Sequence, residues 1–234
     1  MHKIMQDPSL NNADCANDLN EPIEPKQEQL SQLEGELATL PNGEERALKL
    51  LDYGTLLLDF QRWKDAWDAA WEAFEYFSQH EDWEHTVVAT DVLFSSEQPD
   101  SNRALGHGIW LAVSAPINPE TSVAILDHLM EESPVGSETS VIAAVTAHFL
   151  ADVRSEPDSK SRENLMFFTN QRLAEAAAKH RPIQTQEEFE IWMQGNQFDT
   201  PEYFLPRLSA AVDAMVDGQW WFDRDAIRAR FSAE

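Results

Sequence analysis

Apolar residues recur at helical spacing over much of the chain. Between 44 and 60 they form a broad stripe that comprises Leu48, Leu50, Leu51, Tyr53, Leu57 and Leu58. Between 61 and 78, the large aromatic residues Trp63, Trp67, Trp71 and Phe74 follow one another at steps of four, four and three. Since an α-helix places residues three or four apart on one face, these patterns predict two consecutive amphipathic helices.

Proline and capping residues divide the remaining chain into segments of ordinary helix length. The segments Asn-Pro-Glu at 118–120 and Thr-Pro-Glu at 200–202 each place a capping residue before a proline at the first helical position. Thr185 and Glu188 have the spacing of a capping box. We therefore predict a short helix over 27–40 and further helices over 81–97, 101–115, 119–133, 138–154, 159–180, 185–195, 201–216 and 223–232.

Two of these segments, 86–94 and 140–145, contain β-branched residues that also suit short strands. Neither has hairpin turn residues or strict alternation, so helix is favoured. The predicted fold class is therefore all-α. Many short helices with brief connections pack as antiparallel neighbours, either as a solenoid of helical hairpins or as a compact α-α bundle.

The domain organisation follows from where the helical pattern starts. Residues 1–26 combine three prolines and scattered acids without an apolar period, which predicts a flexible acidic leader. Residues 27–234 are expected to form a single helical domain. Within it we distinguish a repeat-like part over 44–154 and a C-terminal helical part over 158–234.

Small and apolar residues in the segment 47–80 have the spacing of a known repeat. They are Leu50, Tyr53, Gly54 and Leu57 in the first helix and Ala66, Ala70 and Ala73 in the second. This segment resembles the tetratricopeptide repeat, whose signature is Trp, Leu-Gly and Tyr followed by small residues and Phe. Leu50, Tyr53 and Ala70 stand where the repeat usually has Trp, Leu and Phe, and Ser78 stands where its closing Pro is expected.

The resemblance implies a scaffold of antiparallel helical hairpins, in which Gly54 lets the second helix approach closely. A looser second unit is expected over 104–132, where Leu105 and Gly106 precede another apolar helix. Some members of this family clamp a peptide carboxylate with Lys and Arg. No such clamp is assigned here, because the region is nearly devoid of basic residues.

The charge of the chain is strongly negative and unevenly distributed. Its 42 acidic and 17 basic residues give a formal net charge of −25, which argues against direct binding of nucleic acid or of an anionic membrane. Residues 65–153 hold sixteen acids and one base, Arg103. Two interpretations stay open: a solubilising surface suited to a salt-rich cytoplasm, or an electrostatic match to a basic partner.

Sequence features that mark a membrane span, a secretory signal or a disulfide are lacking. No stretch approaches the roughly 20 apolar residues of a membrane-spanning helix, and no apolar signal segment follows Lys3. Cys15 has no second cysteine to pair with. We therefore expect a cytoplasmic protein.

Candidate chemistry is sparse. His80 and His85 flank several acids and are weak metal-ligand candidates, although a five-residue step does not place both rings on one helical face. His148 with Asp152, and His128 with Glu131 or Glu132, do share a face. We interpret each histidine as half-buried beside a carboxylate that raises its pKa.

Nucleophile, phosphate-loop and metalloprotease motifs are absent from the sequence, so we expect no catalytic residue, no cofactor and no enzyme activity.

Tryptophans offer the remaining candidate surfaces. Trp63, Trp67 and Trp71 share one helical face, which predicts core packing or, alternatively, an exposed aromatic groove. The segment Trp220-Trp221-Phe222 cannot point inward as a whole, so part of it is expected to dock the last helix and part to meet a partner. Basic residues then give the last helix an edge that suits the acidic middle of the same chain; they are Arg224, Arg228 and Arg230.

These observations favour an adaptor or assembly chaperone that engages a basic or partly unfolded protein through an acidic helical-repeat surface. The residues expected to contact the partner are Asp82, Glu84, Asp91, Trp220 and Trp221. Two alternatives remain: an acidic inhibitor or nucleic-acid mimic that occupies a basic groove, and a metal-dependent enzyme built on a helical bundle. The oligomeric state does not follow from the sequence.

Overall fold

The computed structural model describes residues 23–231, which form eleven helices and no strand. In chain order the helices are α1 (Ile23–Leu37), α2 (Glu44–Asp59), α3 (Trp63–Gln79), α4 (Trp83–Ser95), α5 (Ser101–Ser114), α6 (Pro119–Glu132), α7 (Glu138–Arg154), α8 (Lys160–His180), α9 (Gln186–Gly195), α10 (Pro201–Val216) and α11 (Arg224–Phe231). The predicted all-α class is confirmed. Most of the leader predicted over 1–26 lies outside the described residues.

Helix ends follow the capping residues in most places. The Asn118 side chain accepts a hydrogen bond from the amide of Glu120, and Thr185 and Glu188 form the expected capping box. Thr200 differs from expectation, because its hydroxyl bonds to the neighbouring Asp199 and makes no cap bond. The two segments rich in β-branched residues are helical, in α4 and α7.

The first helix begins earlier than predicted. It starts at Ile23, four residues before the predicted start at 27. Pro25 falls in its first turn, where amide groups have no helical acceptor, so the missing N–H of proline costs little. A proline near a helix start was therefore mistaken for part of a leader.

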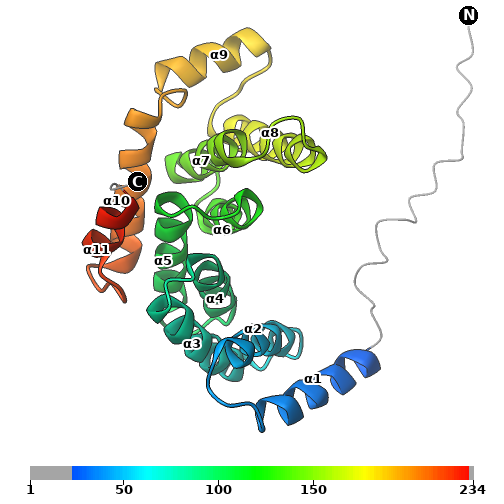
Figure 1. Cartoon of the computed structure of the whole chain (residues 1–234). Helices are drawn as coiled ribbons and strands as arrows, with labels where there is room; N and C mark the ends of the chain where they lie inside the picture. The colour runs from blue at the N-terminus through cyan, green and yellow to red at the C-terminus, as the bar shows by residue number, and fades with distance from the viewer. Residues whose placement is uncertain (1–22, 232–234) are drawn as a thin grey trace, which may run out of the picture.

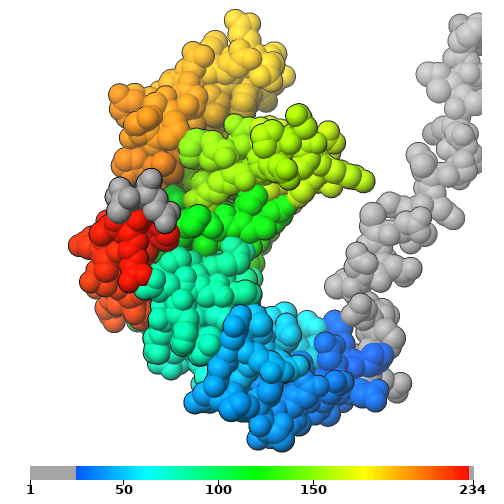
Figure 2. Space-filling model, in the orientation of Figure 1, coloured from blue at the N-terminus to red at the C-terminus, as the bar shows by residue number. Residues whose placement is uncertain are grey.

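Neighbouring helices pack in pairs and in two layers (Figure 1). The strongest pairings join α2 to α3, α4 to α5 and α6 to α7. Helices α2, α4, α6 and α8 form the inner layer of a crescent, α3, α5 and α7 form the outer layer, and α10 packs across α5 and α7. The space-filling view shows the hollow side of the crescent open between α1 and α8 (Figure 2). This arrangement is compatible with helical-hairpin repeats.

Small residues allow the first hairpin to close. Ala66, Ala70 and Ala73 of α3 are each 0% exposed. A Cβ on Gly54 of α2 would lie 3.5 Å from the carbonyl oxygen of Ala66 and 3.1 Å from Val92 of α4. A Cβ on Gly54 would thus be tight against α4 and at ordinary contact distance from α3, so the close approach within the first hairpin depends on the alanines of α3.

The second hairpin does not follow the frame suggested by 104–132. Helix α5 packs more extensively on α4 and α10 than on α6, so the pairing begins at Trp83. A Cβ on Gly106 would lie 2.8 Å from Val216 of α10, which shows that this glycine serves the packing of α10. The sequence alone gave no sign that α10 returns to α5.

Gly108 supplies a test of this packing. A Cβ there would lie 2.3 Å from Thr90 Oγ1 and 3.2 Å from Ile125, both buried in the core. Gly108→Ala should destabilise the fold by about 1–3 kcal/mol, measured by chemical denaturation. Gly35→Ala on α1, where no atom lies within 4 Å, is the control and should stabilise by about 0.5–1 kcal/mol. Equal effects of the two substitutions would contradict the packing.

Candidate functional site

Half of the sixteen acids in the segment 65–153 contact cations from outside the segment, and Arg172 contacts two of them, Asp127 and Glu131. The pairs across the segment boundary are Arg46–Glu72, Arg62–Asp65, Lys64–Asp68, Arg162–Asp152, Arg172–Asp127, Arg207–Glu138 and Arg230–Glu81. Arg103 pairs with Asp100. Basic residues of both ends thus fold back onto the acidic middle and reduce the free negative surface. In the last helix Arg230 does so, whereas Arg224 pairs with Asp213 and Arg228 with Asp225.

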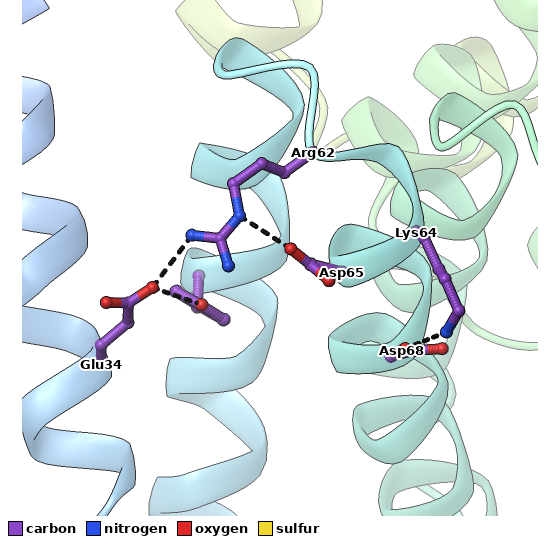
Figure 3. A network of polar contacts seen from close by, with 6 residues as sticks. Glu34, Arg62, Lys64, Asp65 and Asp68 are labelled. Atoms are coloured by element: carbon purple, nitrogen blue, oxygen red, sulfur yellow. Dashed lines mark hydrogen bonds and ion pairs between the residues drawn. The ribbon is translucent and has the colours of Figure 1, made fainter.

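One polar network ties the first helix to the first hairpin (Figure 3). Glu34 of α1 accepts hydrogen bonds from the Tyr53 hydroxyl at 2.8 Å and from Arg62 at 3.0 Å, and Arg62 also donates to Asp65 at 2.7 Å. The bond from Tyr53, and next that from Arg62, lowers the pKa of Glu34. The tyrosine of the repeat-like unit therefore has a polar role besides packing.

Acidic side chains also gather where the inner helices meet. Asp91 of α4 lies 2.7 Å from Nε2 of His128 on α6, and Asp127 of α6 lies 2.5 Å from Nε of Arg172 on α8. Arg172 also contacts Glu131 at 3.3 Å and Glu175 at 3.2 Å. Since these partly exposed contacts join helices of the inner layer, they lie on the hollow side of the crescent.

We call this group the inner acidic cluster; it comprises Asp91, Asp127, Glu131 and Glu175 with Arg172 and His128. Four carboxylates against one guanidinium leave three negative charges when His128 is neutral. The hydrogen bond to Asp91 raises the pKa of His128, and the charges of Asp91, Glu131 and Asp127 act in the same direction. The partner of His128 is therefore Asp91 and not Glu131 or Glu132, as its own helix suggested.

Two of the acids predicted to contact a partner are held in local structure. Asp82 caps α4 by accepting from the amide of His85 at 3.1 Å. Glu84 accepts from the amide of Asn118 at 2.8 Å and from the Thr121 hydroxyl, which joins the starts of α4 and α6. Asp91 alone of the three belongs to the inner acidic cluster.

The histidines do not converge on a common site. Among residues 23–231, no group of three or more His, Cys, Asp or Glu side chains is placed to hold a metal ion. His80 bonds to the carbonyl oxygen of Tyr76, and His85 bonds to Asp82. The two weak metal candidates thus each have a nearby partner.

His148 differs from its prediction. Its Nδ1 lies 3.1 Å from the Thr169 hydroxyl oxygen, while Asp152 pairs with Arg162. Burial lowers the pKa of His148 and outweighs the opposing charge of Asp152. A four-residue spacing could not reveal this, because α8 both buries the ring and attracts the carboxylate.

Residues 217–223, between α10 and α11, pack on the outer side of the crescent; we call this segment the C-terminal latch. Asp217 and Gly218 adopt left-handed backbone conformations (φ 52° and 70°), which reverse the chain. Trp221 then packs edge-on against Trp71 and Phe74 of α3, with ring centroids 4.7 and 5.3 Å away.

A buried histidine holds the latch. The Trp221 amide donates to Nε2 of His107 at 2.9 Å, and the two rings stack at 4.2 Å. Nδ1 of His107 lies 2.7 Å from the carbonyl oxygen of Arg103, so it carries the proton. Burial lowers the pKa of His107 to about 4, and the charges of Arg103 and Arg224 act in the same direction.

Trp220 also lies against its own chain. The Arg224 guanidinium sits 3.9 Å from the Trp220 ring centre, and Trp110 approaches that ring at 5.9 Å. No role was predicted for His107 from the sequence, although the flanking Gly106 and Gly108 indicate tight surroundings. Its bond to the Trp221 amide depends on the tertiary structure.

The chain is therefore an all-α protein of paired antiparallel helices, with an acidic cluster on the inner side and an aromatic latch on the outer side. Comparison with protein-family models, with curated proteins and with solved structures finds no match in any of the three. Over residues 23–231, no helix has the length and apolar character needed to cross a membrane.

Acid should release the latch. Because His107 has a pKa of about 4 in the fold and an ordinary value of 6.5, the unfolded chain takes up the proton first as pH falls. The contribution of neutral His107 to the free energy of unfolding is full above pH 6.5 and decreases by roughly 3 kcal/mol at most as pH falls to about 4. His107→Gln, which keeps an acceptor, should show a smaller loss in denaturant unfolding between pH 7 and 4.5. Equal acid sensitivity would contradict this assignment.

His128 should act in the opposite direction. Its pKa is raised, so the stabilisation from the Asp91 pair is full below the ordinary value of 6.5 and is lost as pH rises through the higher folded value. NMR titration should place the His128 midpoint above that of a histidine in an unfolded peptide. Asp91→Asn should bring the midpoint down. A native midpoint unaffected by Asp91→Asn would show that another group raises the pKa.

Proposed function

We propose that this protein is an adaptor or assembly chaperone that holds a basic segment of a partner protein in the hollow of its crescent. The observation that carries the proposal is the inner acidic cluster. It leaves three uncompensated negative charges when His128 is neutral and two when His128 is protonated, all on partly exposed side chains. A basic segment would complete the compensation that Arg172 begins.

The shape of the inner side supports a polypeptide ligand. Inner helices from successive hairpins lie side by side along the hollow (Figure 2), so one extended segment can contact several of them. The resemblance of 47–80 to a tetratricopeptide repeat supports the same role for the scaffold. A net charge of −25 favours a basic partner and accelerates its encounter at low salt.

The nucleic-acid mimic is less well supported. Such a mimic needs rows of free carboxylates at phosphate-like spacing. In the inner acidic cluster, Arg172 sits among three of the carboxylates and His128 faces the fourth. This mixed arrangement suits a segment that carries a few basic residues among others.

The test is an affinity capture from native lysate with quantified partners across a salt series. The variant Asp91→Asn/Glu131→Gln/Glu175→Gln keeps the Asp127–Arg172 pair and removes three charges from the inner face. We expect partner affinity to decrease by roughly tenfold or more at low salt, and the native protein to approach the variant as salt increases.

A charge-matched variant is the control. Glu75→Gln/Glu97→Gln/Glu156→Gln removes three exposed charges outside the inner acidic cluster, so its net charge is also −25 + 3 = −22. It should retain the partner. Equal loss from both variants would show that only net charge matters, and unchanged binding by the first variant would refute the inner face as the site.

A further inference from the structure

Three tryptophans border an open pocket of about 330 Å³ on the outer side of the crescent, which we call the tryptophan pocket. Trp67 and Trp71 come from successive turns of α3, with ring centroids 6.0 Å apart and planes 12° from parallel. Trp221 of the latch stands nearly perpendicular to both, at 86° and 82°. The other lining residues are Asp68 and Asp100.

The tryptophans of α3 show a part of each predicted role, because Trp67 and Trp71 pack against a core cluster formed mainly by α2, α3 and α4 while part of each side chain stays exposed. Trp67 and Trp71 remain partly exposed, while the alanines of α3 occupy its buried face. The close approach of α2 requires small residues there, which turns the indoles toward the latch. The core packing predicted for Trp67 and Trp71 is thus partial, and both residues also line a pocket at the surface.

The chemistry of the tryptophan pocket suits a cation. Indole faces carry partial negative charge and attract cations, and the only charged residues in the lining are two carboxylates. Asp68 pairs with Lys64 and Asp100 pairs with Arg103, but both carboxylates are about half exposed. Lys64 is 75% exposed, so an incoming cation can replace it at Asp68, whereas Arg103 is 20% exposed and stays in place while the incoming cation shares Asp100.

We propose that the tryptophan pocket binds an arginine side chain of a partner protein. A guanidinium stacks flat on an indole while its edge donates hydrogen bonds to a carboxylate, and the tryptophan pocket contains both indoles and carboxylates. A quaternary ammonium has no N–H to donate, and a lysine ammonium is compact and strongly hydrated. Planarity and edge donors together select arginine.

The site is distinct from the inner acidic cluster. It is built from α3, the residue before α5 and the latch, all on the outer side, whereas the cluster joins α4, α6 and α8. The latch supplies one wall, which His107 holds through the Trp221 amide. Arginine binding therefore depends on a closed latch and goes beyond the function proposed for the inner face.

The first experiment uses a blocked Gly-Arg-Gly peptide and its citrulline counterpart, in which the guanidinium is replaced by a neutral urea of the same shape. Indole N–H signals are followed by NMR on the full chain at pH 7. We expect the arginine peptide to shift the signals of Trp67, Trp71 and Trp221 saturably, and the citrulline peptide to bind about tenfold more weakly or worse.

Charge variants locate the site without removing its aromatic walls. Asp68→Asn/Asp100→Asn should weaken arginine binding by about tenfold, and Asp100 makes no side-chain cap bond that would be lost. Glu75→Gln on the same helix α3 is the matched control and should leave binding unchanged. The inner-face variant Asp91→Asn/Glu131→Gln/Glu175→Gln should also bind the peptide normally, so the two proposals fail independently.

Several results would overturn the proposal. Equal binding of the citrulline peptide would show that the tryptophan pocket makes only apolar contacts, and tighter binding of a trimethyllysine peptide would show that it prefers a quaternary ammonium. Shifts confined to tryptophans other than Trp67, Trp71 and Trp221 would place the arginine elsewhere. Trp67→Leu, which keeps an apolar side chain against Trp71, should abolish saturable binding.

Discussion

The close approach of neighbouring helices is the constraint on which the rest of the structure depends. At Gly54, Gly106 and Gly108 the adjacent helices leave no room for a relaxed Cβ, and alanines occupy the facing positions of α3. Backbones this close stack the hairpins into a crescent with one hollow side. The same demand for small residues moves the indoles of α3 to the surface, where the latch meets them.

Charge is organised by this packing and not only by composition. The charged residues of the segment 65–153 are sixteen acids and one arginine. Cations from both ends of the chain nevertheless pair with these acids, as Arg46 does with Glu72 and Arg207 with Glu138. In both pairs the carboxylate is about half exposed and the arginine is less exposed, and such partly exposed pairs contribute modestly to stability. Their larger effect is to concentrate the remaining negative potential, so the inner acidic cluster stands out more than a net charge of −25 suggests.

The latch joins stability to the outer surface through one neutral imidazole. His107 donates from one nitrogen and accepts at the other, and protonation would remove the acceptor that the Trp221 amide needs. His128 responds in the opposite sense, because a carboxylate faces it. The pKa values of the two histidines thus shift in opposite directions, because burial dominates at His107 and the hydrogen bond to Asp91 dominates at His128.

The sequence by itself determined the helices, nearly all of their ends and the first hairpin, because apolar period, prolines and caps act within a few residues. The caps at Asn118 and Thr185 are local and were correctly predicted. Two predictions were wrong: Pro25 lies inside the first turn of α1, where a proline is tolerated, and the Thr200 hydroxyl donates to Asp199 instead of capping α10. Only the tertiary structure decided which acids are free, which histidine is buried, and that Trp221 meets α3. Those facts depend on contacts between residues far apart in the chain, such as Arg172 with Asp127 and His107 with Trp221, and no local pattern encodes them.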